Sequence, residues 1–254
     1  MLVGMNDRGG AIGTGGGLAV ESRAMKARGE RMEHSAAVQD YLRAIYDLAR
    51  SGTAVSTSAL AERVGVAPAS VTGMLKRLDK GGLVRHEPYA GVRLTPAGER
   101  VALEVIRHHR LIETYLAEAM GVDWDQVHEE AHRLEHHISE DLEDRMATLL
   151  GDPVQDPHGA WIPPKEGPFD APRYGVLAEA EAGQRLVIRE VVDEDASRLR
   201  YLGTLGLRPG VELDVLEVAP FAGPLTVRVA GEAHAIGREL AGTIFVEESS
   251  APAA

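Results

Sequence analysis

The sequence predicts a mainly α-helical protein that ends in a small β-barrel. Helical periodicity of apolar residues dominates from about Ser35 to Leu150, and short strand-like runs separated by turn residues dominate after about residue 175. Between 53 and 98 the order is helix, turn, helix and β-hairpin, which is the order of a winged helix-turn-helix. We therefore expect a winged helix-turn-helix over 34–97, a helical domain over 98–150, a Pro-rich linker over 151–174 and a barrel over 175–248.

The composition excludes several classes of protein. The chain of 254 residues is 44% hydrophobic and has no cysteine, so disulfides, thiolate metal sites and a cysteine nucleophile are impossible. No apolar run has the length of a membrane span, and the N-terminus lacks an apolar signal core. We expect a cytoplasmic protein that has no membrane partner.

The two ends of the chain differ from the rest. Residues 1–33 are rich in Gly and have no apolar period, which predicts a disordered N-terminal extension. A disordered tail is expected over 249–254. The glycines of the extension form neither a P-loop nor a G-x-G-x-x-G frame, so they do not indicate phosphate binding.

The DNA-binding unit is predicted element by element. A first helix begins near Ser35 and ends before Gly52, and a short helix from Ser58 ends at the Gly65 turn. Pro68 suits the first turn of the next helix, which Gly81–Gly82 stops. Strand-like runs at 83–87 and 91–95 complete the wing.

Basic charge is concentrated in this unit. Residues 53–98 hold six basic and three acidic side chains, a local charge of +3 in a chain of net charge −12. We expect the second helix of the motif to enter the major groove, and hydroxyl and basic groups to contact phosphates. The expected DNA-binding residues are Ser58, Ser70, Thr72, Gly73, Lys76, Arg77, Arg85 and Arg93.

Two long helices are expected after the wing. Thr95 and Pro96 open the first, which runs to about Met120, and Asp123 with Gln126 predicts a capping box for a second helix to about Leu150. Two long helices that follow a DNA-binding unit usually build a dimer interface, and the apolar faces of these helices fit that role.

The second of these helices carries a stripe of metal-binding residue types. Offsets of 0, +4, +7 and +8 place four side chains on one helical face: His128, His132, Glu135 and His136. His109 and Glu113 form an i, i+4 pair on the preceding helix. Imidazole and carboxylate groups bind Mn, Fe, Co, Ni or Zn, so the two helices predict one or two divalent metal ions. The alternative is a solvated, histidine-rich polar face.

The C-terminal module is predicted as a barrel of roughly five strands. Strands are expected at 184–192, 210–216, 225–229 and 243–246, with a short helix at 196–205. Residues 175–248 contain seven Arg, no Lys and thirteen acidic residues, a local charge of −6, so this module is not expected to contact DNA.

These segments resemble the diphtheria toxin repressor family of metal-dependent transcriptional regulators, with its iron-dependent and manganese-transport branches. The resemblance covers about 35–248 and rests on 40–46 (DYLRAIY), 109–113 (HRLIE), 128–136 (HEEAHRLEH), 156–159 (DPHG) and 202–210. It implies a regulator rather than an enzyme, an SH3-like barrel, a homodimer on operator DNA and two metal ions per subunit.

The resemblance also implies which residues bind metal. The primary site would comprise Asp40, His132, Glu135 and His136. The ancillary site would comprise His109, Glu113 and His128, completed from the barrel by Asp195 or Glu194. Arg198 stands where a second barrel ligand often lies, and an arginine cannot bind a cation.

Metal identity is predicted from the ligand types. Iron-dependent members tend to have Met and Cys at the positions of Asp40 and His132, and manganese members tend to have Asp and Glu. A site without sulfur favours Mn(II), with Fe(II) as the alternative. We expect a Mn(II)-activated repressor of metal-uptake genes, or alternatively an Fe(II)-dependent regulator of iron homeostasis, with no organic cofactor.

A switching mechanism and two rival functions follow. Repulsion among Asp40, Glu135 and Glu113 is expected to hold the first helix away until a cation draws the carboxylates together. A metalloenzyme could use the same cluster to activate water, but no spare general base is evident and the winged helix would be unexplained. The other rival is a sensor of an organic ligand that holds structural metal.

Overall fold

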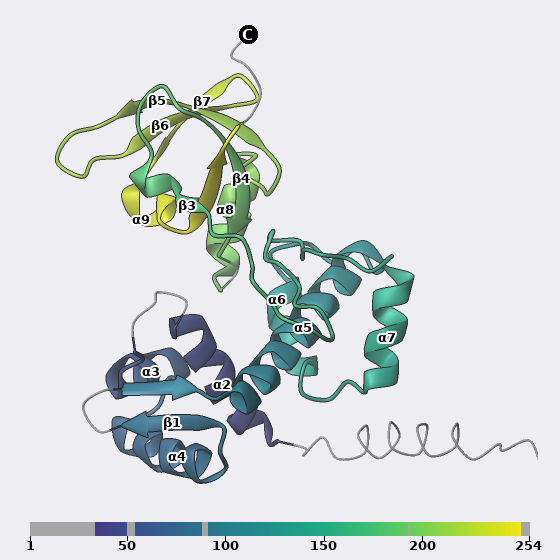
Figure 1. Cartoon of the computed structure of the whole chain (residues 1–254). Helices are drawn as coiled ribbons and strands as arrows, with labels where there is room; N and C mark the ends of the chain where they lie inside the picture. Colours follow the sequence, from purple (N-terminus) through teal and green to yellow (C-terminus); the bar gives the residue numbers. More distant parts are fainter. Residues whose placement is uncertain (1–33, 50–53, 88–90, 193, 250–254) are drawn as a thin grey trace, which may run out of the picture. The chain divides into compact units, whose positions relative to one another are not determined.

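The computed structural model describes residues 34–49, 54–87, 91–192 and 194–249 (Figure 1). The extension expected over 1–33, residues 250–254 of the expected tail and the tip of the wing at 88–90 lie outside the described residues. The described residues from Ala36 onwards form one compact unit. Within the described ranges, no helix combines the length and the apolarity needed to cross a membrane.

The winged helix-turn-helix has the predicted order of elements. Helices α2 (Ala36–Ala49), α3 (Thr57–Val64) and α4 (Pro68–Lys80) precede strands β1 (Val84–Glu87) and β2 (Gly91–Leu94). Ser56 caps α3 by accepting a hydrogen bond from the Ala59 amide, and Gly65 ends it with a φ of 70° that favours glycine. The shared core includes Leu42, Ile45, Leu60, Val71, Leu75 and Leu78, each at most 1% exposed.

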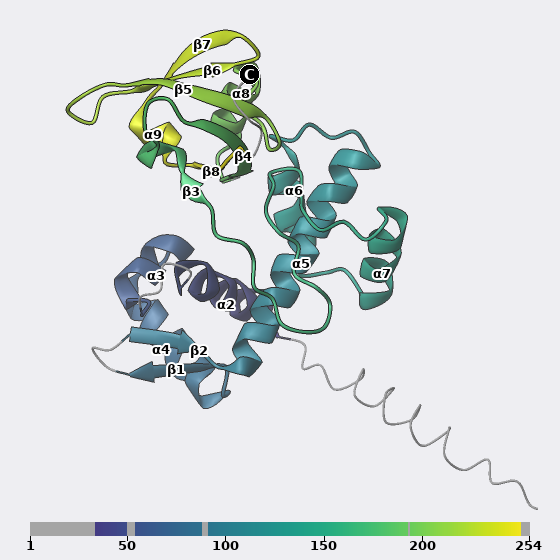
Figure 2. The ribbon, with the colours of Figure 1, turned by 45° about the horizontal axis from the view of Figure 1, so that its top comes forward.

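Three helices, not two, make up the helical domain. The long helix α5 (Pro96–Glu118; Figure 2) is followed by α6 (Val127–Leu134) and α7 (Glu140–Leu149). The predicted single helix to Leu150 is wrong, because the Ser139 hydroxyl accepts a hydrogen bond from the Leu142 amide and starts a new helix there. The expected capping box is also absent, since Gln126 is the N-cap residue of α6 and makes no side-chain cap bond.

Much of the Pro-rich segment packs against α5 instead of running free. Ile162 is 6% exposed and belongs to the core that α5, α6 and α7 share. Arg107 donates to the carbonyl of Pro163 (2.9 Å), and Arg110 donates to the carbonyl of Trp161 (2.5 Å). The segment therefore extends the helical domain to about residue 164.

The C-terminal module is a six-stranded antiparallel sheet with the order β3-β8-β4-β5-β6-β7. The strands are β3 (Gly175–Val176), β4 (Arg185–Val191), β5 (Glu212–Val218), β6 (Leu225–Val229), β7 (Glu232–Ile236) and β8 (Ile244–Glu248), with helices α8 (Ala196–Thr204) and α9 (Arg238–Ala241). The strands placed within the predicted barrel of roughly five left out β3 and β7. Strand β3 has only two residues. The EAHAI sequence of β7 has little β propensity, and only the two residues Ala230 and Gly231 separate β7 from β6.

Trp124, from the loop between α5 and α6, joins the hydrophobic core of the barrel. The guanidinium carbon of Arg208 lies 4.3 Å from the centroid of its ring. His158 Nε2–H donates to the Trp124 carbonyl (2.7 Å), and the Val191 amide of β4 donates to the His158 carbonyl (2.9 Å). The barrel is thus packed against the loop that leads into the histidine-rich helix α6.

Candidate metal centre

The first candidate site lies where α6 ends and faces α2. The Nδ1 atom of His132 lies 2.7 Å from Glu135 Oε1. The Nε2 atom of His136 lies 2.9 Å from Asp40 Oδ1 on α2 and 3.4 Å from Glu135 Oε1. Although α6 ends at Leu134, the structure brings together all four side chains expected at the primary site.

Gln39 fixes the orientation of His136, and sequence reasoning missed it. Its amide oxygen lies 2.6 Å from His136 Nδ1, which must donate a proton to it. This contact leaves Nε2 of His136 directed at Asp40 and available to a cation. A glutamine beside a candidate ligand gives no signal in the sequence, because its partner lies 97 positions away.

The second candidate site lies between α5 and α6 and consists of His109, Glu113 and His128. Nε2 of His109 lies 2.9 Å from Glu113 Oε1 and 3.1 Å from Nδ1 of His128, and that Nδ1 lies 3.2 Å from the same carboxylate oxygen. Glu113 is completely buried. The three expected ancillary ligands from these helices therefore share one cluster.

His109 connects the two clusters. Its Nδ1 lies 2.6 Å from Glu135 Oε2 in the first cluster, while its Nε2 faces Glu113 in the second. Burial would lower the pKa of His109, but the carboxylate of Glu113 raises it above its usual range. Burial would raise the pKa of Glu135, yet hydrogen bonds from His109 and the charges of His109 and Arg43 lower it to about 2.

The donor set fits a divalent cation. All seven residues offer imidazole nitrogen or carboxylate oxygen, which suits Mn, Fe, Co, Ni or Zn. Oε2 of Glu113 is buried and makes no hydrogen bond with the described residues, although it lies 3.8 Å from His158 Nδ1. A buried carboxylate oxygen without a hydrogen bond is costly, and a cation in the cluster would offset that cost.

The two barrel residues expected at the ancillary site have different surroundings. Asp195 accepts hydrogen bonds from the amides of Ser197 (2.9 Å) and Arg198 (3.1 Å) and caps α8. Glu194 lines the cavity that Asp40, His128 and His132 also line, and its carboxylate pairs with Arg63 at 2.6 Å. The structure places Glu194 beside the metal-binding residue types, whereas the Asp195 carboxylate is engaged in its own helix.

A neighbouring cluster is neutralised within the protein. His108 Nε2 lies 3.2 Å from Glu143 Oε2, and Arg107 donates to Oε1 of the same carboxylate (2.5 Å). Lys165 adds ion pairs to Glu140 (3.2 Å) and Glu143 (3.8 Å). Burial would raise the pKa of Glu143, but the hydrogen bonds and charges of His108 and Arg107 lower it to about 2.

The lowered pKa of Glu143 predicts an acid-sensitive contribution to stability. The ionised carboxylate stabilises the fold above the unfolded pKa near 4.5, and this stabilisation is lost as pH falls towards about 2. Glu143→Gln should cost about 1–3 kcal/mol at neutral pH. Thermal melts from pH 7 to 2 should show the deficit shrinking below about pH 4.5, whereas exposed Glu118→Gln should show no deficit. A deficit independent of pH would contradict the prediction.

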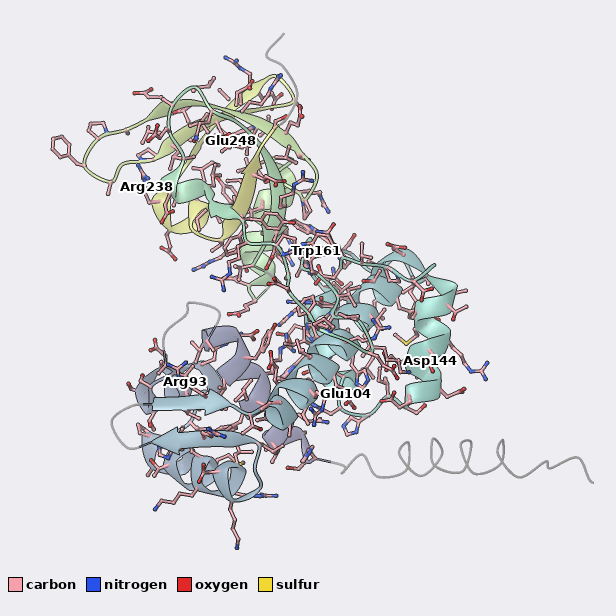
Figure 3. The ribbon with its side chains drawn as sticks, in the orientation of Figure 1. Arg93, Glu104, Asp144, Trp161, Arg238 and Glu248 are labelled. Atoms are coloured by element: carbon pink, nitrogen blue, oxygen red, sulfur yellow. The ribbon has the colours of Figure 1, made fainter. Side chains whose placement is uncertain are left out.

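The residues expected to bind DNA lie on one module and are exposed. Ser58 lies on α3, and Ser70, Thr72, Gly73, Lys76 and Arg77 lie on α4. Arg85 lies on β1, and Arg93, labelled in Figure 3, lies on β2. Thr72 donates its hydroxyl proton to the Pro68 carbonyl (3.0 Å), so this proton is not free for the phosphate contact expected of Thr72. A Cβ built on Gly73 meets nothing within 4 Å, so the fold does not require glycine there.

Comparisons with known proteins match all three modules. Residues 33–92 match the iron dependent repressor N-terminal DNA binding domain, 95–164 its metal binding and dimerisation domain, and 176–248 the FeoA domain. The chain is 32% identical over 221 residues to the iron-dependent repressor IdeR of Mycobacterium tuberculosis, covering 82% of this chain and 95% of the relative. The chain belongs to the diphtheria toxin repressor family.

Further similarities span both branches of this family of transcriptional regulators. The diphtheria toxin repressor of Corynebacterium diphtheriae is 31% identical over 218 residues, which cover 82% of this chain and 95% of that protein. A solved manganese-dependent transcriptional repressor in complex with manganese has a TM-score of 0.79 and 36% identity, covering 84% of this chain and all of that one. The expected family and fold class are confirmed, and the chain is a metal-dependent transcriptional regulator, not an enzyme.

Proposed function

We propose that this protein is a Mn(II)-activated repressor of metal-uptake genes that binds operator DNA as a homodimer. The observation that carries the choice of metal is the sulfur-free primary site, in which Asp40 and His132 supply an oxygen and a nitrogen. Similarity to a solved manganese-dependent repressor supports it. The alternative is an Fe(II)-dependent regulator, which the similarity to IdeR favours.

Two metal ions per subunit are proposed. Asp40, His132, Glu135 and His136 would hold the primary ion. His109, Glu113 and His128 would hold the ancillary ion, with Glu194 as the barrel ligand in preference to Asp195, because only Glu194 lines the cavity beside His128. A bound divalent cation supplies positive charge that stabilises the converging carboxylates and links α2 to α6.

Anaerobic DNA-retardation titrations test the metal assignment. The parent should retard its operator with Mn(II), and also with Fe(II), because nitrogen and oxygen ligands do not exclude Fe(II). The double variant Asp40→Met with His132→Cys should shift the preference towards Fe(II), since thiolate favours the softer ion. A parent that responds to Fe(II) but not to Mn(II) would establish the iron alternative.

Phosphate contacts are proposed for Lys76 and Arg77, which are exposed on α4. Replacing either by Gln should weaken binding to all DNA sequences alike and reduce the slope of log affinity against log salt by about one. Arg228→Gln, on the barrel strand β6, is the control and should leave the slope unchanged. If Lys76→Gln and Arg77→Gln also leave it unchanged, the DNA surface lies elsewhere.

The dimer interface is proposed on an apolar face of the helical domain. Large hydrophobic side chains there are exposed: Met120 (62%), Leu134 (44%), Leu142 (44%) and Leu149 (68%). Together with Ile112, Leu116 and Met146 they line one cavity whose surface is mainly apolar. An exposed apolar patch on a domain that matches a dimerisation domain is best explained by a second copy of the chain.

A further inference from the structure

Arg43 extends from α2 to the central carboxylate of the candidate primary site. Its Nη1 donates to Glu135 Oε2 at 2.8 Å across 92 positions of sequence. The side chain of Glu135 is fully buried and that of Arg43 is 20% exposed. Arg43 lies on the same helix as Asp40, so one element supplies both a proposed metal ligand and a resident cation for the same site.

Both oxygens of Glu135 are already engaged. Oε1 accepts from His132, while Oε2 lies 2.8 Å from Arg43 and 2.6 Å from His109. An imidazolium can release a carboxylate oxygen by losing its proton, but a guanidinium stays charged at any physiological pH. Arg43 can therefore leave the Glu135 oxygen only by moving away.

Helix α2 is held towards the end of α6 by ion pairs, not repelled from it. Arg43 pairs with Glu135, and Asp40 pairs with His136. The expected mutual repulsion of the carboxylates is thus offset within the protein. The arginine already neutralises the negative charge that a bound metal cation would neutralise.

We propose that Arg43 is a built-in competitor for the metal ion, which must leave Glu135 before the primary site can bind a divalent cation. Arg43 then sets the metal concentration at which the protein responds. The inference rests on the proposed primary site. It predicts that removing the guanidinium strengthens metal binding, whereas a residue that only orients Glu135 would weaken metal binding when removed.

The test uses full-length Arg43→Gln without DNA, titrated with Mn(II) while free Mn(II) is followed by electron paramagnetic resonance. The primary-site Kd should fall at least about tenfold, the equivalent of one charge-assisted hydrogen bond. The metal-free melting temperature should fall as well, because buried Glu135 loses its cation. Arg43→Lys restores a positive charge, so its Kd should return most of the way to the higher parental value. His128→Ala identifies which step of the titration belongs to the ancillary site.

Arg133→Gln is the matched control. Arg133 lies on α6 directly after His132 but pairs with Glu129 (3.8 Å) and Glu130 (2.7 Å), neither of which is a proposed ligand. An equal gain in affinity for Arg133→Gln would mean general electrostatics and would overturn direct competition, as would unchanged or weaker binding by Arg43→Gln. If the primary site were assigned to the wrong residues, Glu135→Gln would still bind two Mn(II) per subunit. This result distinguishes a wrong assignment of the site from a failure of the proposed competition.

Discussion

Replacing Glu135 by Gln should abolish the metal-dependent binding of DNA. Glu135 receives contacts from His109, His132 and Arg43, and glutamine keeps its shape but not its charge. Metal affinity at the primary site should fall by more than about 100-fold, because loss of outer-shell partners alone costs about 10- to 100-fold. Operator retardation should be absent at Mn(II) concentrations that saturate the parent, and bound Mn(II) should fall to one ion per subunit.

Glu129→Gln is the matched control for this substitution. Glu129 lies on α6, is exposed and pairs with Arg133 at 3.8 Å, away from both clusters. This variant should keep two ions and the full response, while circular dichroism and sedimentation show that Glu135→Gln remains a folded dimer. An undiminished metal response in Glu135→Gln would remove Glu135 from the primary site.

Sequence spacing was sufficient to bring together the candidate ligands that share a helix. His109 with Glu113, and His128 with His132, lie one turn apart, and the structure keeps each pair on one helical face. The wing, the Pro68 start of α4 and the Gly65 turn also follow from local chemistry that acts over a few residues. Asp40 was assigned through family resemblance, and the structure places it 2.9 Å from His136.

Spacing could not reveal contacts between distant segments. Arg43 and Gln39 reach Glu135 and His136 from 92 and 97 positions away, and nothing in helix α2 marks those side chains as facing the site. The break after α6 was missed for a different reason. The helical period continues through the sequence 135–139, and a serine cap inside a periodic run is a weak signal.

The same packing explains why the two clusters should act together. His109 contacts Glu135 through one ring nitrogen and Glu113 through the other, so neither carboxylate can change its charge without affecting the shared ring. A cation at Nε2 of His109 would leave Nδ1 as a donor to Glu135. Filling the ancillary site should therefore fix the orientation of the carboxylate that serves the primary site.

Leu142→Glu should convert the protein to a monomer and weaken operator binding by about 100-fold or more, because a dimer binds its second half-site intramolecularly. Leu142 lies in the first turns of α7 and is 44% exposed, so a charged side chain there disturbs the apolar face without filling the core. Equilibrium sedimentation at micromolar protein and operator retardation with saturating Mn(II) measure the two effects.

Leu216→Glu is the control for this face. Leu216 lies on the barrel strand β5 and is 36% exposed, so it accepts a similar change of charge away from the helical domain. It should remain dimeric and bind operator normally. The number of bound Mn(II) ions distinguishes loss of the dimer from loss of metal binding, because Leu142→Glu should still bind Mn(II) through α2, α5 and α6. A Leu142→Glu protein that stays dimeric would place the interface on another surface, and the exposed leucines of α6 and α7 would then need a different partner.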